Sequence, residues 1–332
     1  MQVLAALVLT QASDAGAVRS VLVPARYGAV VAAGIGTVLL IADLKTPRRF
    51  LHMLRIYRPT SPMSFGSYVL VVFSAVSALA ALLQLLADLG VAAAPRPLEL
   101  GVQWTAAAVG LLMLTYTGPL LSATSTPLWA QSPRLLAAGF AAFSMAAGAS
   151  ALVLWSLATG GPYGERLERV ALLSLLAAWL CLILWLARLE APRSKTRAAA
   201  GWAAPLLQGS AGAIMVFGVA GGGLVLPALM HLLQLYTAAP LAWASAVAAA
   251  GELAGSLLWR GALLLAGQDS ARRTTDALRA AGWQADAAES LEEARRDPAG
   301  ARRRARRPRW LIGGLSLGGL GTAVGVGLAL AA

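Results

Sequence analysis

The sequence predicts an all-α integral membrane protein with eight to nine transmembrane helices, because of its composition, its long apolar runs and the glycine and proline inside them. Of 332 residues, 58% are hydrophobic and 13% are charged, whereas about 25% of a soluble domain is charged. Glycine and proline are more frequent in membrane helices than in soluble ones. Backbone groups in lipid must be hydrogen-bonded within their own segment, so each run is expected to be helical. The alternating pattern of membrane barrel strands is absent.

Nine apolar runs are candidate spans. They are residues 1–11, 27–44, 65–93, 101–121, 134–159, 168–187, 203–234, 239–267 and 311–331. A helix needs about 20 residues to cross the hydrocarbon core. The run at 27–44 is marginal. The run at 1–11 is short and lacks the basic region of a signal peptide, so it is either complete as it stands or the stub of a helix that starts upstream.

The distribution of lysine and arginine predicts the orientation. Loops 45–64, 122–134 and 188–202 and segment 268–310 together carry 21 of these residues. The other side carries five: Arg19, Arg26, Arg96, Arg166 and Arg169. Basic loops stay in the cytoplasm. We therefore expect a multi-pass protein of a bacterial-type inner (plasma) membrane, with a cytoplasmic N-terminus. The basic cluster Arg302–Arg309 is better explained by anionic membrane lipid or a partner subunit than by nucleic acid.

Two histidines and one cysteine limit the cofactors that the chain can hold. His52 is predicted in a cytoplasmic loop and His231 near the opposite face, so the two are unsuited to ligate one haem or metal ion. A lone cysteine, Cys181, cannot hold an iron–sulfur cluster. We expect neither haem nor an iron–sulfur cluster in this chain. Gly221–Gly223 precede Pro227 within an apolar run, which indicates helix packing or a kink.

Residues 43–67 contain two motifs: Asp43-Leu44 with Pro47-Arg48-Arg49-Phe50, and Ser61-Pro62-Met63-Ser64 with Gly66. They resemble the NrfD/PsrC family of membrane subunits of polysulfide-reductase-like oxidoreductases. That family has an Asp-Leu-Gly-Arg-Pro-x-Arg-Phe loop followed by Ser-Pro-Met-Ser-Trp-Gly. The matching residues are Asp43, Leu44, Pro47, Arg49, Phe50, Ser61, Pro62, Met63, Ser64 and Gly66. Lys45 and Thr46 replace Gly-Arg, and Phe65 replaces Trp.

Further similarity follows downstream. It lies in Tyr116–Gly118 with Leu120, Leu121 and Ser122, in Pro127–Trp129, in Gly251-Glu252, in Ala266-Gly267 and in Ser270-Ala271. The resemblance covers residues 1–271. Residues 272–310 read as an Arg-rich cytoplasmic connector and 311–331 as an extra transmembrane helix, which we expect to be dispensable for the family-like part.

The resemblance implies a fold of two packed four-helix bundles with a quinone site near the membrane edge. It also implies a ferredoxin-like iron–sulfur partner subunit, often with a molybdenum or multihaem catalytic subunit beyond it. In such a complex, electrons pass directly between quinone and an external cluster. This chain then contributes a quinone pocket and proton-carrying groups.

Glu252 is the first candidate proton group, because an ionisable residue inside a span is costly and suggests function. A carboxyl group there can carry a quinol proton. The structural alternative is a hydrogen-bonded Glu252 that pairs with Arg260, although eight residues put the two about 80° apart around a helix. His52 is another candidate proton group, with a solvent-exposed interfacial histidine as the alternative.

Asp43, Arg49 and Tyr116 are candidates near the membrane edge. Asp43 is either an ion-pair cap beside the basic loop or a group for proton entry or quinone contact. Tyr116 and Arg49 are candidates for the quinone pocket, where Tyr116 could donate to a quinone carbonyl; tyrosine is also common at interfaces. We expect Ser64 to be the N-cap of the third span, with Pro62 in the preceding turn.

Three functions compete for this sequence. The first is the quinone-reactive membrane subunit of a multisubunit oxidoreductase. Without the resemblance, a secondary transporter or channel ranks equally, because hydropathy does not separate these classes. The third is a purely structural membrane anchor that has lost quinone chemistry, which the replaced Gly-Arg keeps open.

Overall fold

The computed structural model describes residues 1–11, 15–43, 55, 61–124, 126–130, 132–161, 164–190, 209–237 and 241–280. The candidates Arg49 and His52 lie outside the described residues. So do the predicted connector beyond residue 280 and the predicted span 311–331. Asp43 ends a described helix, but its side chain lies outside the described part.

The described residues fold into helices without a strand, so the predicted all-α class is confirmed. In chain order they are α1 (Gln2–Gln11), α2 (Ala15–Asp43), α4 (Pro62–Asp88), α5 (Arg96–Ser122), α6 (Pro127–Ala130), α7 (Pro133–Thr159), α8 (Gly164–Glu190), α10 (Gly209–Ala213), the π-helix η2 (Ile214–Val225), α11 (Leu226–Tyr236) and α12 (Ala242–Ala280). The segments α10, η2 and α11 follow one another without a break.

Six helices in the described part are long and apolar enough to cross a membrane. They are Arg19–Ala42, Pro62–Asp88, Arg96–Ser122, Pro133–Thr159, Gly164–Leu189 and Gly209–Gln234. The ten residues of α1 are too few to cross. Helix α12 is long, but Glu252 and Arg260 lower its hydropathy. The expected total of eight to nine spans therefore stays a prediction.

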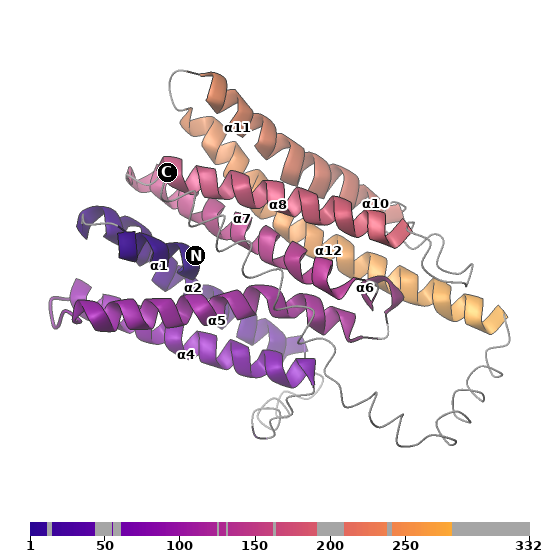
Figure 1. Ribbon diagram of the computed structural model, residues 1–332, viewed down its shortest axis with the longest axis horizontal. Coiled ribbons are helices and arrows are strands. Elements are labelled where there is room, and N and C mark those ends of the chain that lie inside the picture. Colours follow the sequence, from indigo (N-terminus) through magenta and orange to yellow (C-terminus); the bar gives the residue numbers. More distant parts are fainter. Residues whose placement is uncertain are drawn as a thin grey trace.

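The helices pack in two groups (Figure 1). The first group holds α1, α2, α4 and α5, and the second holds α7, α8, α12 and the continuous α10–η2–α11 segment. Helices α5 and α7 pack against each other and join the groups. This arrangement agrees with the two bundles that the resemblance implies.

Successive helices run in opposite directions, which defines two faces of the molecule (Figure 1). At the face that we call the basic face, the helices that flank the predicted basic loops begin or end: Asp43, Pro62, Ser122, Pro133, Glu190 and Gly209. At the opposite face lie the other ends: Asp88, Arg96, Thr159, Gly164, Tyr236 and Ala242. The chain order thus gathers the basic loops at one end of the bundle.

An aromatic cluster fills the core of the second group. The buried ring of Trp259 stacks on Phe143, with centroids 5.1 Å apart and planes 15° apart. The ring of Trp185 meets Trp259 edge-on at 5.6 Å. These rings come from α7, α8 and α12, so they hold the three helices in one arrangement.

Glycines bring the π-helix η2 against α12. A Cβ atom at Gly223 would overlap the backbone of Gly255, and a Cβ atom at Gly255 would overlap that of Gly223. Such close contact between backbones is typical of membrane helix interfaces. Gly223 therefore lies at a helix-packing contact, which is one of the two roles that the sequence indicated for Gly221–Gly223.

Two predicted details are wrong. The N-cap of α4 is Ser61, whose hydroxyl accepts from the Ser64 backbone N–H, and Pro62 occupies the first turn. Proline suits that position because its missing N–H has no partner there. Helix α2 begins at Ala15, well before the predicted start at residue 27, so Arg19 and Arg26 are helical and not loop residues.

Candidate proton-transfer site

Glu252 lies on α12, ten residues after the helix begins at Ala242. Its side chain is buried, with 2% of the residue exposed. Carboxylate Oε1 lies 3.1 Å from Nε2 of His231 on α11. The Ser150 hydroxyl on α7 hydrogen-bonds to Oε2. Both oxygens of the carboxyl group therefore have a partner, each from a different helix.

The Ser150 hydroxyl has two acceptors within reach and one proton to donate. One acceptor is Oε2 of Glu252, and the other is the Ala146 carbonyl one turn back on α7, at 2.7 Å. When the carboxyl group is ionised, the hydroxyl donates to it. When the carboxyl group is neutral, it can donate to Ser150, which then donates to Ala146. Each protonation state of Glu252 is thus satisfied without movement of a helix.

Arg260 is not the partner of Glu252. Its guanidinium donates to the Ser256 carbonyl at 2.7 Å and to the Ser144 hydroxyl at 2.7 Å. It also lies over the Phe140 ring, 5.8 Å from the centroid. The suggested Glu252–Arg260 pair is therefore wrong, because the offset around α12 directs Arg260 to α7 at a different depth.

Tyr116 lies in the first group, between α4 and α5. Its ring packs on Gly66, where any Cβ atom would overlap it. Tyr116 is six residues before the end of α5 at Ser122, which is about 9 Å from the basic face along the helix. Glu252 is about 15 Å from the opposite face by the same measure. The structure thus leaves Tyr116 and Glu252 in separate helix groups and at different depths.

Asp43 ends α2 at the same face as Tyr116. Arg49 and His52 follow it in the sequence, outside the described residues. The structure therefore neither joins nor separates these three candidates and Tyr116.

His231 was missed as a site residue because the sequence suggested a place near the membrane edge. It is in fact buried against Glu252. The signal was available, since an ionisable residue inside an apolar run is the criterion that selected Glu252. The partnership itself was not visible, because 21 residues and a helix reversal separate the two.

Arg26 was also missed, and it was wrongly placed in a loop. Only 1% of Arg26 is exposed. Its guanidinium donates to Oε1 of Gln103 at 3.1 Å and of Gln84 at 2.9 Å, and it lies 3.3 Å from Glu99. These partners come from α4 and α5, so Arg26 ties three helices of the first group together. Gln84 and Gln103, each inside an apolar run, were the sequence signal that a polar partner lies in the interior.

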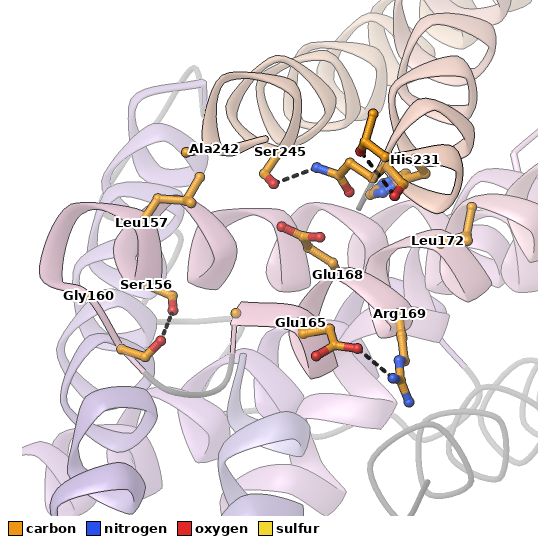
Figure 2. Close-up of a pocket in the computed structure, with 14 residues that line it drawn as sticks. Ser156, Leu157, Gly160, Glu165, Glu168, Arg169, Leu172, His231, Ala242 and Ser245 are labelled. Carbon is orange, nitrogen blue, oxygen red and sulfur yellow. Dashed lines mark hydrogen bonds and ion pairs between the residues drawn. The ribbon is translucent and has the colours of Figure 1, made fainter. Parts of the chain in front are cut away.

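A cavity of about 680 Å³ lies beside the Glu252 site, where α7 and α11 end and α8 and α12 begin (Figure 2). Its walls are Ser156, Leu157, Gly160, Gly161, Gly164, Glu165, Glu168, Arg169, Leu172, His231, Gln234, Thr237, Ala242 and Ser245. Most of these residues are polar or glycine. His231 therefore lies between this cavity and Glu252.

In the part of the chain that the structure describes, no group of three or more histidine, cysteine, aspartate or glutamate side chains could hold a metal ion. The expected lack of haem and iron–sulfur clusters stays a prediction.

The helices and the buried Glu252–His231 pair define a class of protein: an α-helical, multi-pass membrane protein with an ionisable pair in its interior. The family model described as polysulphide reductase, NrfD, matches residues 1–270. The chain belongs to the NrfD family, as its motifs suggested. This family consists of membrane subunits of quinone-linked oxidoreductases. Comparison with curated proteins and with solved structures gives no match.

Proposed function

We propose that this chain is the quinone-reactive membrane subunit of a multisubunit oxidoreductase and that Glu252 and His231 handle the protons of quinol. The observation that carries the proposal is the buried pair, with 3.1 Å between His231 Nε2 and Glu252 Oε1, inside a member of the NrfD family. A charged residue at the centre of a span costs about 2.5–3.5 kcal/mol on insertion scales. That cost favours a working proton group over a purely structural anchor.

Oxidation of a quinol releases two electrons and two protons. Two histidines and one cysteine give this chain little with which to hold a redox centre. The electrons therefore pass to a partner, which we propose is a ferredoxin-like iron–sulfur subunit. A molybdenum or multihaem catalytic subunit follows in the complex. The family match favours this function over a secondary transporter or channel.

The quinone pocket in this proposal lies near the basic face. Tyr116 is half-buried there and offers a hydroxyl that can donate to a quinone carbonyl. Arg49, Asp43 and His52 follow α2 at the same end of the bundle and are the further candidates. The partner subunit binds at this face, close enough for direct electron transfer.

Polar side chains on α12, between the depth of Tyr116 and that of Glu252, support the proposal. Arg260 lies about 27 Å along α12 from its start, and Tyr116 about 30 Å along α5, so the two are at similar depths. Arg260 bonds to Ser256 and Ser144. Ser256 is one turn from Glu252 on the same face of α12. Polar side chains therefore lie along α12 from Arg260 to within one turn of Glu252.

The location and domain division belong to the same proposal. We place the chain in a bacterial-type inner (plasma) membrane with the basic face in the cytoplasm. The predicted cytoplasmic position of Met1 is not kept, because Met1 packs beside Gly148, midway along α7. Residues 1–271 form the working part, 272–310 an Arg-rich connector and 311–331 an extra span. Helix α12 continues to Ala280, so the chain crosses the boundary at residue 271 without a break. The family match ends next to that boundary.

The test uses the purified complex and two electron donors. Quinol should reduce the terminal acceptor only when this subunit is present, whereas an artificial donor should reduce the partner without it. Tyr116→Phe, which removes only the hydroxyl, should raise the KM for quinol by roughly tenfold, the value of about one hydrogen bond. Equal quinol turnover with and without the subunit would contradict the proposal.

A further inference from the structure

We propose that the cavity beside α8 is a water-filled vestibule and that His231 conducts protons between it and Glu252. Glu252 then exchanges its proton with water at the face opposite the basic face. This inference relies on the proposed function only for the source of the proton, because the vestibule and its link to Glu252 stand on the geometry alone.

By the types of residue present, the lining of the cavity suits water better than a quinone, although carbon atoms make up the larger part of its surface. Binding sites for apolar ligands are mostly hydrophobic and aromatic. Here the walls of the 680 Å³ space carry two glutamates, an arginine, a glutamine and several hydroxyls, and they include no aromatic ring besides the imidazole of His231. Leu157, Leu172 and Ala242 are the apolar contributions.

The mouth of the cavity is charged and exposed. Arg169 donates to Glu165 one turn earlier on α8, at 2.6 Å, and the two side chains are 47% and 79% exposed. Figure 2 shows Glu168 between this ion pair on one side and Ser245 and His231 on the other. Charged groups need water in a membrane protein. Water therefore reaches inward from this mouth at least to Glu168.

Glu168 connects the mouth to the inner wall. With its amide oriented to satisfy its neighbours, Gln234 donates to Glu168 at 3.0 Å and accepts from the Ser245 backbone N–H at 3.0 Å. Gln234 is three residues after His231, on the same side of α11. Polar groups thus continue from the mouth to the imidazole of His231.

His231 is the link between the two sites. Among the residues that line the cavity, His231 alone has a hydrogen bond with Glu252 within the described structure. An imidazole has two nitrogens and can accept a proton at one while it releases a proton from the other. His231 is therefore placed to pass a proton without exposing Glu252 to water.

The proton transfer balances with water as its sole other reactant. Neutral Glu252 gives its Oε1 proton to Nε2 of His231, which leaves a carboxylate and an imidazolium. The imidazolium gives its Nδ1 proton to a cavity water, which becomes hydronium. To restore the starting tautomer, the imidazole turns about its side-chain bonds so that Nε2 releases its proton to cavity water and Nδ1 takes one up, and the ring then turns back toward Glu252. Ser150 donates to Oε2 and stabilises the carboxylate until the next proton arrives.

The charged groups around this pair favour transfer toward the cavity. Glu168 of α8 attracts a positive charge on the cavity side of His231. On α12, Arg260 is two turns from Glu252 and is bonded to Ser256 and Ser144. On α7, the group that faces Glu252 is the neutral Ser150. With the orientation proposed above, protons of quinol would leave on the outer side of the membrane.

The vestibule is tested by cysteine accessibility in membranes that contain the full complex. Cys181→Ser first removes the native thiol. Leu172 lines the cavity, whereas its neighbour Leu173 points outward and is 44% exposed. The two leucines share helix and depth, so Leu172→Cys and Leu173→Cys form a matched pair. Thiols react as thiolates, which form in water and not in lipid.

A small, membrane-impermeant thiol reagent should label Leu172→Cys from the side of the Gly161 loop and leave Leu173→Cys unlabelled. Labelling of neither variant, or labelling of Leu172→Cys from the basic face, would overturn the vestibule. Protection of Leu172→Cys by a quinone analogue would overturn it as well, because the cavity would then be a quinone site. None of these results depends on quinol turnover.

The role of His231 is tested by His231→Gln with imidazole rescue. Quinol turnover should fall by roughly 10²-fold, the usual effect of losing a proton-transfer group. Added imidazole, which fits the cavity, should restore part of it, whereas a misfolded variant would not respond. Wild-type turnover, or a loss that imidazole does not change in a correctly assembled complex, would overturn the inference. A wild-type complex without quinol activity would refute the proposed function and leave the labelling test to decide the vestibule.

Discussion

Buried polar residues in this molecule fall into two kinds that differ in their partners. Glu252 and His231 are both titratable, and they share one hydrogen bond and a neighbouring cavity. Arg26 donates to the buried amides of Gln84 and Gln103, and its carboxylate partner Glu99 is partly exposed. The first kind can change its proton content, and the second can hold helices in place. We therefore assign proton handling to the first and stability to the second.

Replacement of Arg26 tests whether this residue stabilises the fold. Arg26→Ala should leave the Oε1 atoms of the buried Gln84 and Gln103 without their common donor, so the free energy of unfolding should fall by about 1–3 kcal/mol for each of them. Arg19→Ala is the matched control on the same helix. Arg19 pairs with Asp88 and its side chain is 61% exposed, so its loss should cost about 1 kcal/mol or less. Thermal unfolding in detergent measures both, and equal losses would contradict the structural role of Arg26.

The sequence predicted single functional residues, but not the residues that they contact in the fold. Glu252 was found because an ionisable group in an apolar run is rare. Its pairing with His231 depends on how α11 turns back onto α12, and hydropathy does not report that. The same holds for Arg26, whose acceptor on Gln103 is 77 residues away.

Helix packing decides whether the proton pair forms. The His231–Glu252 contact joins α11 to α12, and these elements approach closely because Gly223 and Gly255 leave room for backbone contact. Pro227, the second residue of α11, packs against Gly251, where a Cβ atom would lie 3.0 Å from the proline ring. Small residues beside the site therefore set its geometry.

Glycine replacements on α12 test this dependence. Gly255→Ala should push η2 away from α12, because its Cβ atom would meet the Gly223 backbone. Both thermal stability and quinol turnover should fall. Gly261→Ala is the control, since a Cβ atom there meets nothing within 4 Å. It should be neutral or stabilising by up to about 1 kcal/mol, because alanine favours helices over glycine. Similar behaviour of the two variants would contradict the account.

The apolar runs predicted which segments are helical, but they did not predict where every helix begins. The run at 134–159 agrees with α7 to within one residue. The run at 27–44 missed the first part of α2, because Arg19 and Arg26 interrupt the hydropathy there. In the fold, Arg26 is bonded to buried side chains and Arg19 pairs with Asp88 at the opposite face, and a sequence does not show such partners.

The two faces of the molecule have different proposed roles. The basic loops and Tyr116 belong to one face, and the vestibule opens at the other. Electrons would leave at the first face and protons at the second. The charge bias toward one set of loops predicts which face is cytoplasmic.

Reporter fusions test this orientation. Fusions after Pro59 and Ser194 should report the cytoplasm, and a fusion after Gly161, which lies at the vestibule face, should report the outside. Pairs of reporters that are active on only one side of the membrane give the readout. The reverse pattern would place the vestibule in the cytoplasm and reverse the direction of proton release.

The class of fold and the family were predictable from the sequence, because composition and motifs extend over most of the chain. The NrfD match over residues 1–270 confirms the family. The vestibule was not predictable, because its walls come from four helices whose ends meet only in the folded bundle.

The most direct test of the central claim is the quinol turnover of a complex that carries Glu252→Gln. Glutamine keeps the size of the side chain and can still hydrogen-bond to Ser150 and His231, but it does not titrate. Turnover with quinol should fall by roughly 10²-fold or more, while assembly and electron transfer from an artificial donor to the partner stay at wild-type levels. Wild-type quinol turnover in Glu252→Gln would contradict the account and make the buried pair structural.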